Sequence, residues 1–192
     1  MEPRLTDCIP NWSQLVDAVR SRCTNRSSLL HGEEHWMRVA AAELKLLKET
    51  GGGNPTLVLV FALIHDSMRL NDGADLFHGR RAAGFLKALN GELLRLPADG
   101  LEILAAACAS HSESRLTEEP TTAICWDADR LNLWRLGLEP DPRYLSTRAA
   151  DEFRLTWAIG RQDGEFDWDN LYRDFEAEER RRDLLSSSRN VD

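Results

Sequence analysis

The sequence predicts an all-α protein, and three observations lead to this prediction. Apolar residues in the segment 36–47 recur at three- and four-residue steps, which places them on one face of a helix. Helix-ending stretches such as GGGNP at 51–55 and EPDP at 139–142 separate the periodic segments. The most strand-like segment, an apolar run at 57–64, has no candidate partner strand elsewhere in the chain.

The first two helices are expected over Trp12–Cys23 and Glu33–Glu49. Asn11 precedes the first of them, and its side chain is suited to accept hydrogen bonds from the free N–H groups of a first turn. The second helix carries the amphipathic pattern, and the glycines at 51–53 end it.

The apolar run Leu57–Ile64 is compatible with a buried strand or a buried helix, because periodicity does not distinguish the two in so short a segment. We interpret it as a helix because no partner strand is predicted. An irregular polar loop is expected at 67–77. Helices should follow at about Gly79–Leu89 and Asp99–His111.

The next helix is expected over Asp127–Leu136, after the turn-rich stretch TEEPTT, and a last core helix over Thr147–Ile159. Residues 165–192 are rich in acids and arginines, which is typical of a surface helix that fades into a disordered tail. The expected organisation is one helical domain over residues 1–160 with a charged C-terminal helix and tail over 161–192.

Composition and charge exclude several classes of protein. The net charge of −8 argues against nonspecific nucleic-acid binding, which needs a basic surface. No apolar run is long enough to span a membrane, and the first residues lack the apolar stretch of a signal peptide, so we expect a cytoplasmic protein. The four cysteines lack metal-binding spacing, and we expect them to be reduced.

Side chains that can bind a metal lie at the ends or faces of four predicted helices. His35 lies on the second helix, His65 and Asp66 end the apolar helix, His111 ends another, and Asp129 lies at the start of a later one. Helical bundles build metal sites from such inward-facing side chains. Imidazole and carboxylate ligands suit zinc, iron, manganese or nickel, and the absence of nearby thiols disfavours a structural zinc cluster.

The order His35, then His65-Asp66, then Asp129 resembles the H…HD…D signature of the HD-domain superfamily of metal-dependent phosphohydrolases. The segments HGEEHWMRV, ALIHDSMRL and DADRLNL resemble the motifs of this family, over residues 31–147. The resemblance implies an HD-domain-like helical bundle with a metal site between helices. It also implies that these four residues bind a divalent metal ion (Mn, Fe, Ni, Co, Mg or Zn; one or two per chain).

The resemblance further implies hydrolysis of a small phosphate ester or nucleotide by a metal-activated water. Asp66 would bridge two metals or orient that water. His31 lies four residues before the first ligand, where cyclic-nucleotide phosphodiesterases, helical relatives of this family, carry a general acid; its alternative role is a hydrogen bond to the helix start. Asp127 is expected to cap its helix or to contact a ligand, not to bind metal.

His78 and His111 bear on the number of metals. Some members of the family carry two additional histidines between the HD motif and the final Asp, and these bind a second metal. Both histidines of this chain are candidates for that second metal or for the substrate. His78 follows Asp66 by only twelve residues, so its alternative role is to start a helix. The sequence therefore leaves open whether one or two metals bind.

The loop 67–81 is expected to form a wall of the substrate site. Arg69 and Arg81 are candidates for phosphate binding, because a guanidinium group matches the phosphate oxygens; a solvated salt bridge is the alternative for each. Asn71 and Asp72 are candidates for hydrogen bonds to a sugar, with Asx turns within the loop as the alternative.

Two other functions are compatible with the same residues. The first is a diiron oxygenase of the HD fold, which would be favoured if His78 and His111 both bind metal. The second is a non-catalytic nucleotide-binding HD module. For the phosphohydrolase, the expected partner is a small phosphorylated substrate or nucleotide, not a nucleic acid or a membrane. The charged tail is a candidate surface for homo-oligomer formation.

Overall fold

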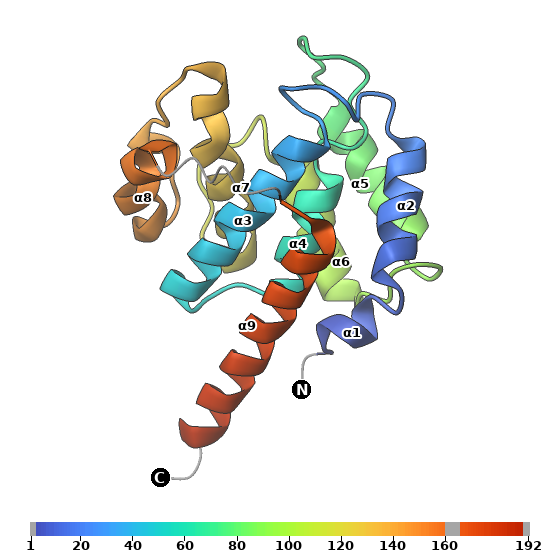
Figure 1. Ribbon diagram of the computed structural model, residues 1–192, viewed down its shortest axis with the longest axis vertical. Coiled ribbons are helices and arrows are strands. Elements are labelled where there is room, and N and C mark those ends of the chain that lie inside the picture. The colour runs from blue at the N-terminus through green and yellow to red at the C-terminus, as the bar shows by residue number, and fades with distance from the viewer. Residues whose placement is uncertain (1–2, 160–165, 190–192) are drawn as a thin grey trace.

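The computed structural model describes residues 3–159 and 166–189 and confirms the all-α prediction (Figure 1). This part of the chain contains no strand. It forms nine α-helices and two 3-10 helices: α1 (Leu5–Cys8), α2 (Trp12–Arg22), α3 (Glu33–Thr50), α4 (Pro55–Ile64), α5 (His78–Leu89), α6 (Ala98–Ser110), α7 (Pro120–Leu131), η1 (Asn132–Leu136), η2 (Pro142–Tyr144), α8 (Arg148–Ile159) and α9 (Trp168–Arg189). The short helix α1 was not predicted.

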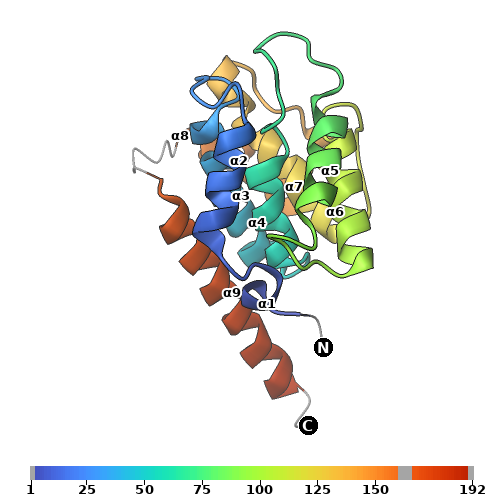
Figure 2. The same ribbon diagram turned by 90° about the vertical axis from the view of Figure 1, so that its right-hand side faces the viewer.

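Helix α4 is the central element of the bundle. All ten of its residues are buried, and α3, α6, α7 and α9 pack around it (Figures 1 and 2). The interpretation of the apolar run as a helix is therefore confirmed. The helix begins at Pro55, two residues earlier than expected, because the side chain of Asn54 caps it and accepts a hydrogen bond from Leu57 N.

The local signals at the first two predicted helices are confirmed. The side chain of Asn11 accepts a hydrogen bond from Gln14 N at the start of α2. Helix α3 ends at Gly51, which adopts a left-handed conformation with φ of 67°. None of the helices in the described part of the chain combines the length and the apolar character needed to cross a bilayer.

The predicted start of the seventh helix is wrong. Helix α7 begins at Pro120, and only its last part coincides with the predicted range. Pro120 stands at the first helical position, and the carboxylate of Glu119 accepts hydrogen bonds from the first turn, so the stretch interpreted as a turn is a helix start. Asp127 and Asp129 therefore lie near the C-terminal end of α7. The expectation that Asp127 caps its own helix is also wrong.

The predicted C-terminal helix is confirmed, but its first half also contributes side chains to the core. Leu171 and Phe175 are buried in the same core as α3 and α4. The second half extends away from the body of the molecule (Figures 1 and 2). Leu184, in this half, is 73% exposed. The predicted disordered tail falls on residues 190–192, outside the described residues. The domain boundary at residue 160 stays a prediction.

Candidate metal centre

All five histidines of the chain gather at one end of the bundle. His35 lies in the first turn of α3, and His65 and Asp66 follow α4 directly. His78 is the first residue of α5, and His111 follows α6 directly. The side chains of Asp66 and of these four histidines are buried and form a cluster that is compatible with a metal site.

The carboxylate of Asp66 lies between two pairs of imidazoles. Its Oδ2 lies 3.7 Å from Nε2 of His35 and 3.8 Å from Nε2 of His65. Its Oδ1 lies 3.1 Å from Nε2 of His78 and 3.5 Å from Nε2 of His111. Each pair of imidazoles, taken with Asp66, forms a group of three potential ligand atoms within 4.8 Å of one another.

The backbone fixes the orientation of three of these rings. His65, His78 and His111 each place Nδ1 between 2.5 and 3.1 Å from a backbone carbonyl oxygen. A carbonyl oxygen only accepts hydrogen bonds, so each neutral ring carries its proton on Nδ1 and directs the Nε2 lone pair into the cluster. This is the tautomer that a metal-binding imidazole needs.

The distances between the rings support a bound cation. The Nε2 atoms of His78 and His111 lie 2.9 Å apart, and those of His35 and His65 lie 3.4 Å apart. Two nitrogen lone pairs at such distances repel each other unless a proton or a metal ion lies between them. Imidazole and carboxylate donors without thiol suit Zn, Fe, Mn, Co or Ni. The side chains in the cluster therefore fit a divalent metal.

The charge states of the cluster also suit a cation. Burial lowers the pKa of His65 to about 3, so this ring is neutral at pH 7. Burial by itself would raise the pKa of Asp66, but its contacts with the surrounding histidines hold the pKa well below its usual range. Burial likewise opposes ionisation of Asp129, and the hydrogen bond from His35 outweighs it and lowers the pKa of Asp129. Asp66 raises the pKa of His111 despite its burial, so a metal that binds at this ring displaces a proton. Neutral imidazoles and ionised carboxylates are the forms that bind metal.

Asp129 and Asp127 lie near each other in sequence but make different contacts. Asp129 extends the His35 side of the cluster, with its Oδ1 3.2 Å from Nε2 of His35. Its role as a ligand stays a prediction, which this position supports. Asp127 is in neither group of potential ligands and accepts hydrogen bonds from the backbone N–H groups of Ser146 and Thr147, just before α8. It therefore holds the start of the following helix.

His31 lies two residues before α3, so the helix does not cover both histidines of the HGEEH segment. Its ring still reaches the cluster, because its Nδ1 lies 3.0 Å from Asp66 Oδ2. Trp36, which is fully buried, fixes this position by donating a hydrogen bond to the carbonyl oxygen of His31. The His31 side chain is 12% exposed, whereas the other four imidazoles are at most 3% exposed.

The four predicted substrate-binding residues differ in what they contact. Arg69 touches the cluster, with its Nε 3.0 Å from Asp66 Oδ1. Arg81 forms an ion pair with Asp75 and donates a hydrogen bond to the carbonyl oxygen of Met68. Its charge is therefore compensated within the loop.

The two polar residues of that loop are also used locally. Asn71 Oδ1 accepts a hydrogen bond from Gly73 N, as in an Asx turn. Asp72 accepts hydrogen bonds from Asn25 and Ser28, which join the loop to the segment before α3. Substrate binding by these four residues stays a prediction.

Arg135, on η1, lies at the cluster and was not predicted. Its Nη2 lies 3.4 Å from Nδ1 of His31. In the sequence it stands in the stretch LWRLGL, which carries no metal-binding or phosphate-binding pattern. Only the fold of η1 after α7 brings it to the site.

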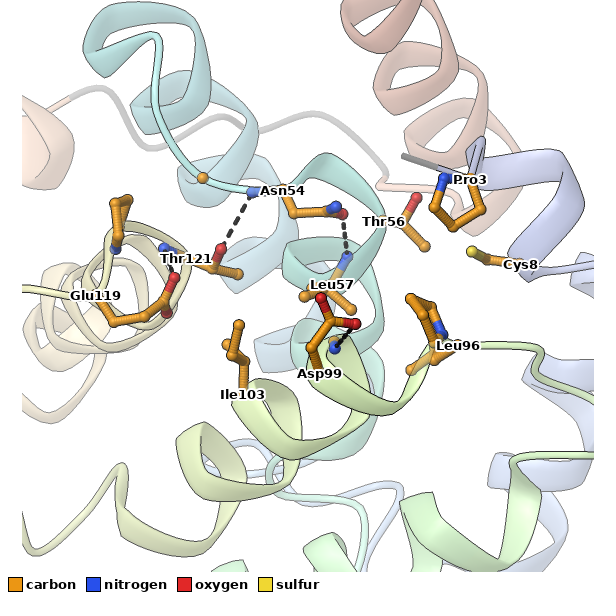
Figure 3. A pocket seen from close by; sticks show the side chains of 14 residues that line it. Pro3, Cys8, Asn54, Thr56, Leu57, Leu96, Asp99, Ile103, Glu119 and Thr121 are labelled. Atoms are coloured by element: carbon orange, nitrogen blue, oxygen red, sulfur yellow. Dashed lines mark hydrogen bonds between the residues drawn. The ribbon is translucent and has the colours of Figure 1, made fainter. Parts of the chain in front are cut away.

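A cavity of about 500 Å³ lies at the opposite end of α4, where the starts of α4, α6 and α7 meet (Figure 3). Asn54, Thr56 and Leu57 line it from α4. The carboxylates of Asp99 and Glu119, which also line it, each accept a hydrogen bond from a backbone N–H in the first turn of their helices. No histidine lines this cavity, so the histidine cluster is the better candidate for chemistry.

Comparison with known proteins adds no further assignment. No protein-family model matches the chain, and neither the curated proteins nor the solved structures contain a significant match. What can be said of function therefore rests on the motif residues and on the geometry of the cluster.

Proposed function

We propose that the protein is a metal-dependent phosphohydrolase of the HD type, which acts on a small phosphate ester or nucleotide. The observation that carries the proposal is the position of Asp66. One carboxylate lies between two pairs of Nε2 atoms, and its two oxygens face different pairs. Asp66 would thus contribute to both groups of ligands if two metal ions bind, and pairs of ions are common in enzymes that cleave phosphate esters.

The cluster would hold one metal ion between His35, His65 and Asp66 and a second between Asp66, His78 and His111. Bound there, divalent ions would supply Lewis-acid activation of a water molecule and of the phosphoryl oxygens. In the overall reaction, the water oxygen forms a bond to phosphorus and the bond from phosphorus to the ester oxygen breaks. One proton of the water ends on the departing alcohol.

His31 is the best candidate to deliver that proton. It is the most exposed of the five imidazoles, so it is the ring a substrate can reach. Its hydrogen bond to Asp66 orients the ring. A positioned general acid typically contributes 10²- to 10⁴-fold to a rate.

The test is hydrolysis of a panel of phosphomonoesters and nucleotides by the purified protein with added Mn, Co, Ni, Mg, Fe or Zn. Wild type should release phosphate with at least one metal. Asp66→Asn should lower kcat/KM by about a thousandfold or more, because charge stabilisation by the metal is lost. Asp141→Asn serves as the control, since Asp141 pairs with Arg143 and lies outside the cluster. A folded wild-type protein that hydrolyses no ester with any metal would contradict the proposal.

A diiron oxygenase is the second candidate, and the group formed by Asp66, His78 and His111 favours it. A diiron enzyme needs ligands for two iron ions, and this group would supply the ligands for the second ion. Two irons per chain in the native protein, together with substrate-dependent O₂ consumption, would support this function over hydrolysis. One metal per chain would exclude it.

A further inference from the structure

The guanidinium group of Arg135 is a cation at the cluster with no carboxylate partner. Its side chain is partly buried. Its Nε donates to the carbonyl oxygen of Leu30 at 2.6 Å, and its Nη1 donates to that of Asn132 at 2.9 Å. In the part of the chain that the structure describes, no carboxylate oxygen lies within 4.0 Å of it. By contrast, Arg69 and Arg81 each pair with an Asp.

The two carbonyl contacts fix the plane of the guanidinium but supply no negative charge. A partly desolvated cation without an adjacent counter-charge is unfavourable, and an anion that binds beside it removes this cost. Asp129 and Asp66 attract Arg135 through space, but neither forms an ion pair with it, and both also contact imidazoles.

The Nη2 group of Arg135 lies beside His31. Nη2 approaches Nδ1 of His31 at 3.4 Å, but that nitrogen also lies 3.0 Å from Asp66 Oδ2. If Nδ1 donates its proton to Asp66, it has no lone pair left to accept from Arg135. An N–H group of Arg135 then lacks an acceptor beside the most exposed imidazole of the cluster.

We infer that Arg135 binds a phosphoryl oxygen of the substrate and selects a terminal phosphate group over a phosphodiester. The inference rests on the proposed function. A terminal phosphate has three non-bridging oxygens, whereas a diester has two. A terminal phosphate can therefore contact the metal ions and still offer an oxygen to Arg135. Guanidinium is well suited to this role, because its planar N–H groups match phosphate oxygens.

The experiment measures binding of inorganic phosphate and of dimethyl phosphate to the full chain loaded with Mn, by isothermal titration calorimetry. Wild type should bind phosphate at least tenfold more tightly than dimethyl phosphate. Arg135→Gln should weaken phosphate binding tenfold or more and leave the binding of dimethyl phosphate nearly unchanged. Arg135→Lys keeps the positive charge but loses the planar set of N–H donors. Its phosphate affinity should lie between those of wild type and Arg135→Gln. Arg143→Gln is the control, since this arginine is 83% exposed and pairs with Asp141.

Metal content and melting temperature are measured for every variant. Phosphate affinity equal to wild type in Arg135→Gln, loss of affinity that follows loss of metal, or no phosphate binding by wild type would each overturn the inference. If Arg135→Gln does not fold, Arg135→Lys decides, and unchanged affinity there would overturn it. Hydrolysis is assayed in parallel. Binding that depends on Arg135 without any turnover would contradict the proposed function alone, whereas turnover with unchanged affinity in Arg135→Gln would contradict the inference alone.

Discussion

Two buried carboxyl groups of this protein have opposite surroundings. Asp66 is ringed by imidazoles and is held in its ionised form. Glu43, on α3, is fully buried and has no ion-pair partner among the described residues. Burial raises the pKa of Glu43 well above its usual range, and the hydrogen bond with the thiol of Cys125 offsets this only in part. Glu43 therefore keeps its proton to a higher pH in the folded protein than in the unfolded chain.

This predicts a pH dependence of stability. Above a pH of about 4.3, Glu43 ionises in the unfolded chain, and it stays protonated in the fold until the pH reaches its raised pKa, so over that range the free energy of unfolding falls as the pH rises. Glu43→Gln removes the titration, and its advantage in stability over wild type should be smallest near pH 4.5 and should grow with pH until Glu43 also ionises in the fold. The growth is limited to about 1.4 kcal/mol per pH unit.

Thermal melts with a chelator present, from pH 4.5 to 8, check this prediction without interference from metal binding. Glu49→Gln is the matched control, because Glu49 is exposed on the same helix. A difference between Glu43→Gln and wild type that stays constant with pH would rule out the buried titration.

At the scale of the elements, the site depends on how closely α5 approaches α6. A Cβ atom on Gly79 would lie 2.4 Å from the carbonyl oxygen of Cys108, which is too close for any side chain. Gly79 follows His78 directly, and the same carbonyl oxygen accepts the hydrogen bond from His111. This close approach therefore sets the distance between the two imidazoles.

Gly79→Ala should push the two helices apart and separate His78 from His111. We expect a loss of stability of about 1–3 kcal/mol from overpacking. If each group of ligands binds a metal, as proposed, the variant should lose the metal of the His78–His111 pair and keep the metal of the His35–His65 pair. Thermal melts and elemental analysis provide the measurements.

Gly84→Ala is the control on the same helix. A Cβ there meets no atom within 4 Å, so the change should stabilise α5 by about 0.5–1 kcal/mol and leave metal binding intact. Full metal content and wild-type stability in Gly79→Ala would show that the helix spacing does not control the second group of ligands.

At the scale of the whole molecule, the cluster ties together helices that are distant in the sequence. Its members come from the start of α3, the end of α4, the start of α5 and the ends of α6 and α7. A ligand that binds only the folded protein stabilises it by mass action, by about 2.7 kcal/mol at a concentration of 100 times its Kd. Metal binding and global stability should therefore be coupled.

Removal of metal with a chelator should lower the melting temperature by about 5–10 °C for a chain of this size, and added Mn, Fe or Zn should restore it. Differential scanning calorimetry gives the measurement. The melting temperature of Asp66→Asn should not change when metal is added or removed. Identical melting temperatures for the chelated and metal-loaded wild-type protein would contradict a metal at this cluster.

Most helices were predictable because their signals are local. The cap at Asn11, the glycines after α3 and the continuous apolar run of α4 each act through neighbouring residues, and the structure confirms them. The prediction of the start of α7 failed because Glu119 and Pro120 are typical of both a turn and a helix start. The packing of α7 against the core decides between the two.

The sequence by itself determined which residues are candidate ligands, because only the order of His and Asp residues along the chain was needed to identify them. Tertiary structure decided which candidates meet. His78 and His111 are 33 residues apart, and the contact at Gly79 brings their Nε2 atoms to 2.9 Å. Tertiary structure also placed Arg135 beside His31, 104 residues away in the chain. Such contacts depend on how the helices pack, and local sequence patterns carry no information about contacts between residues so far apart in the chain.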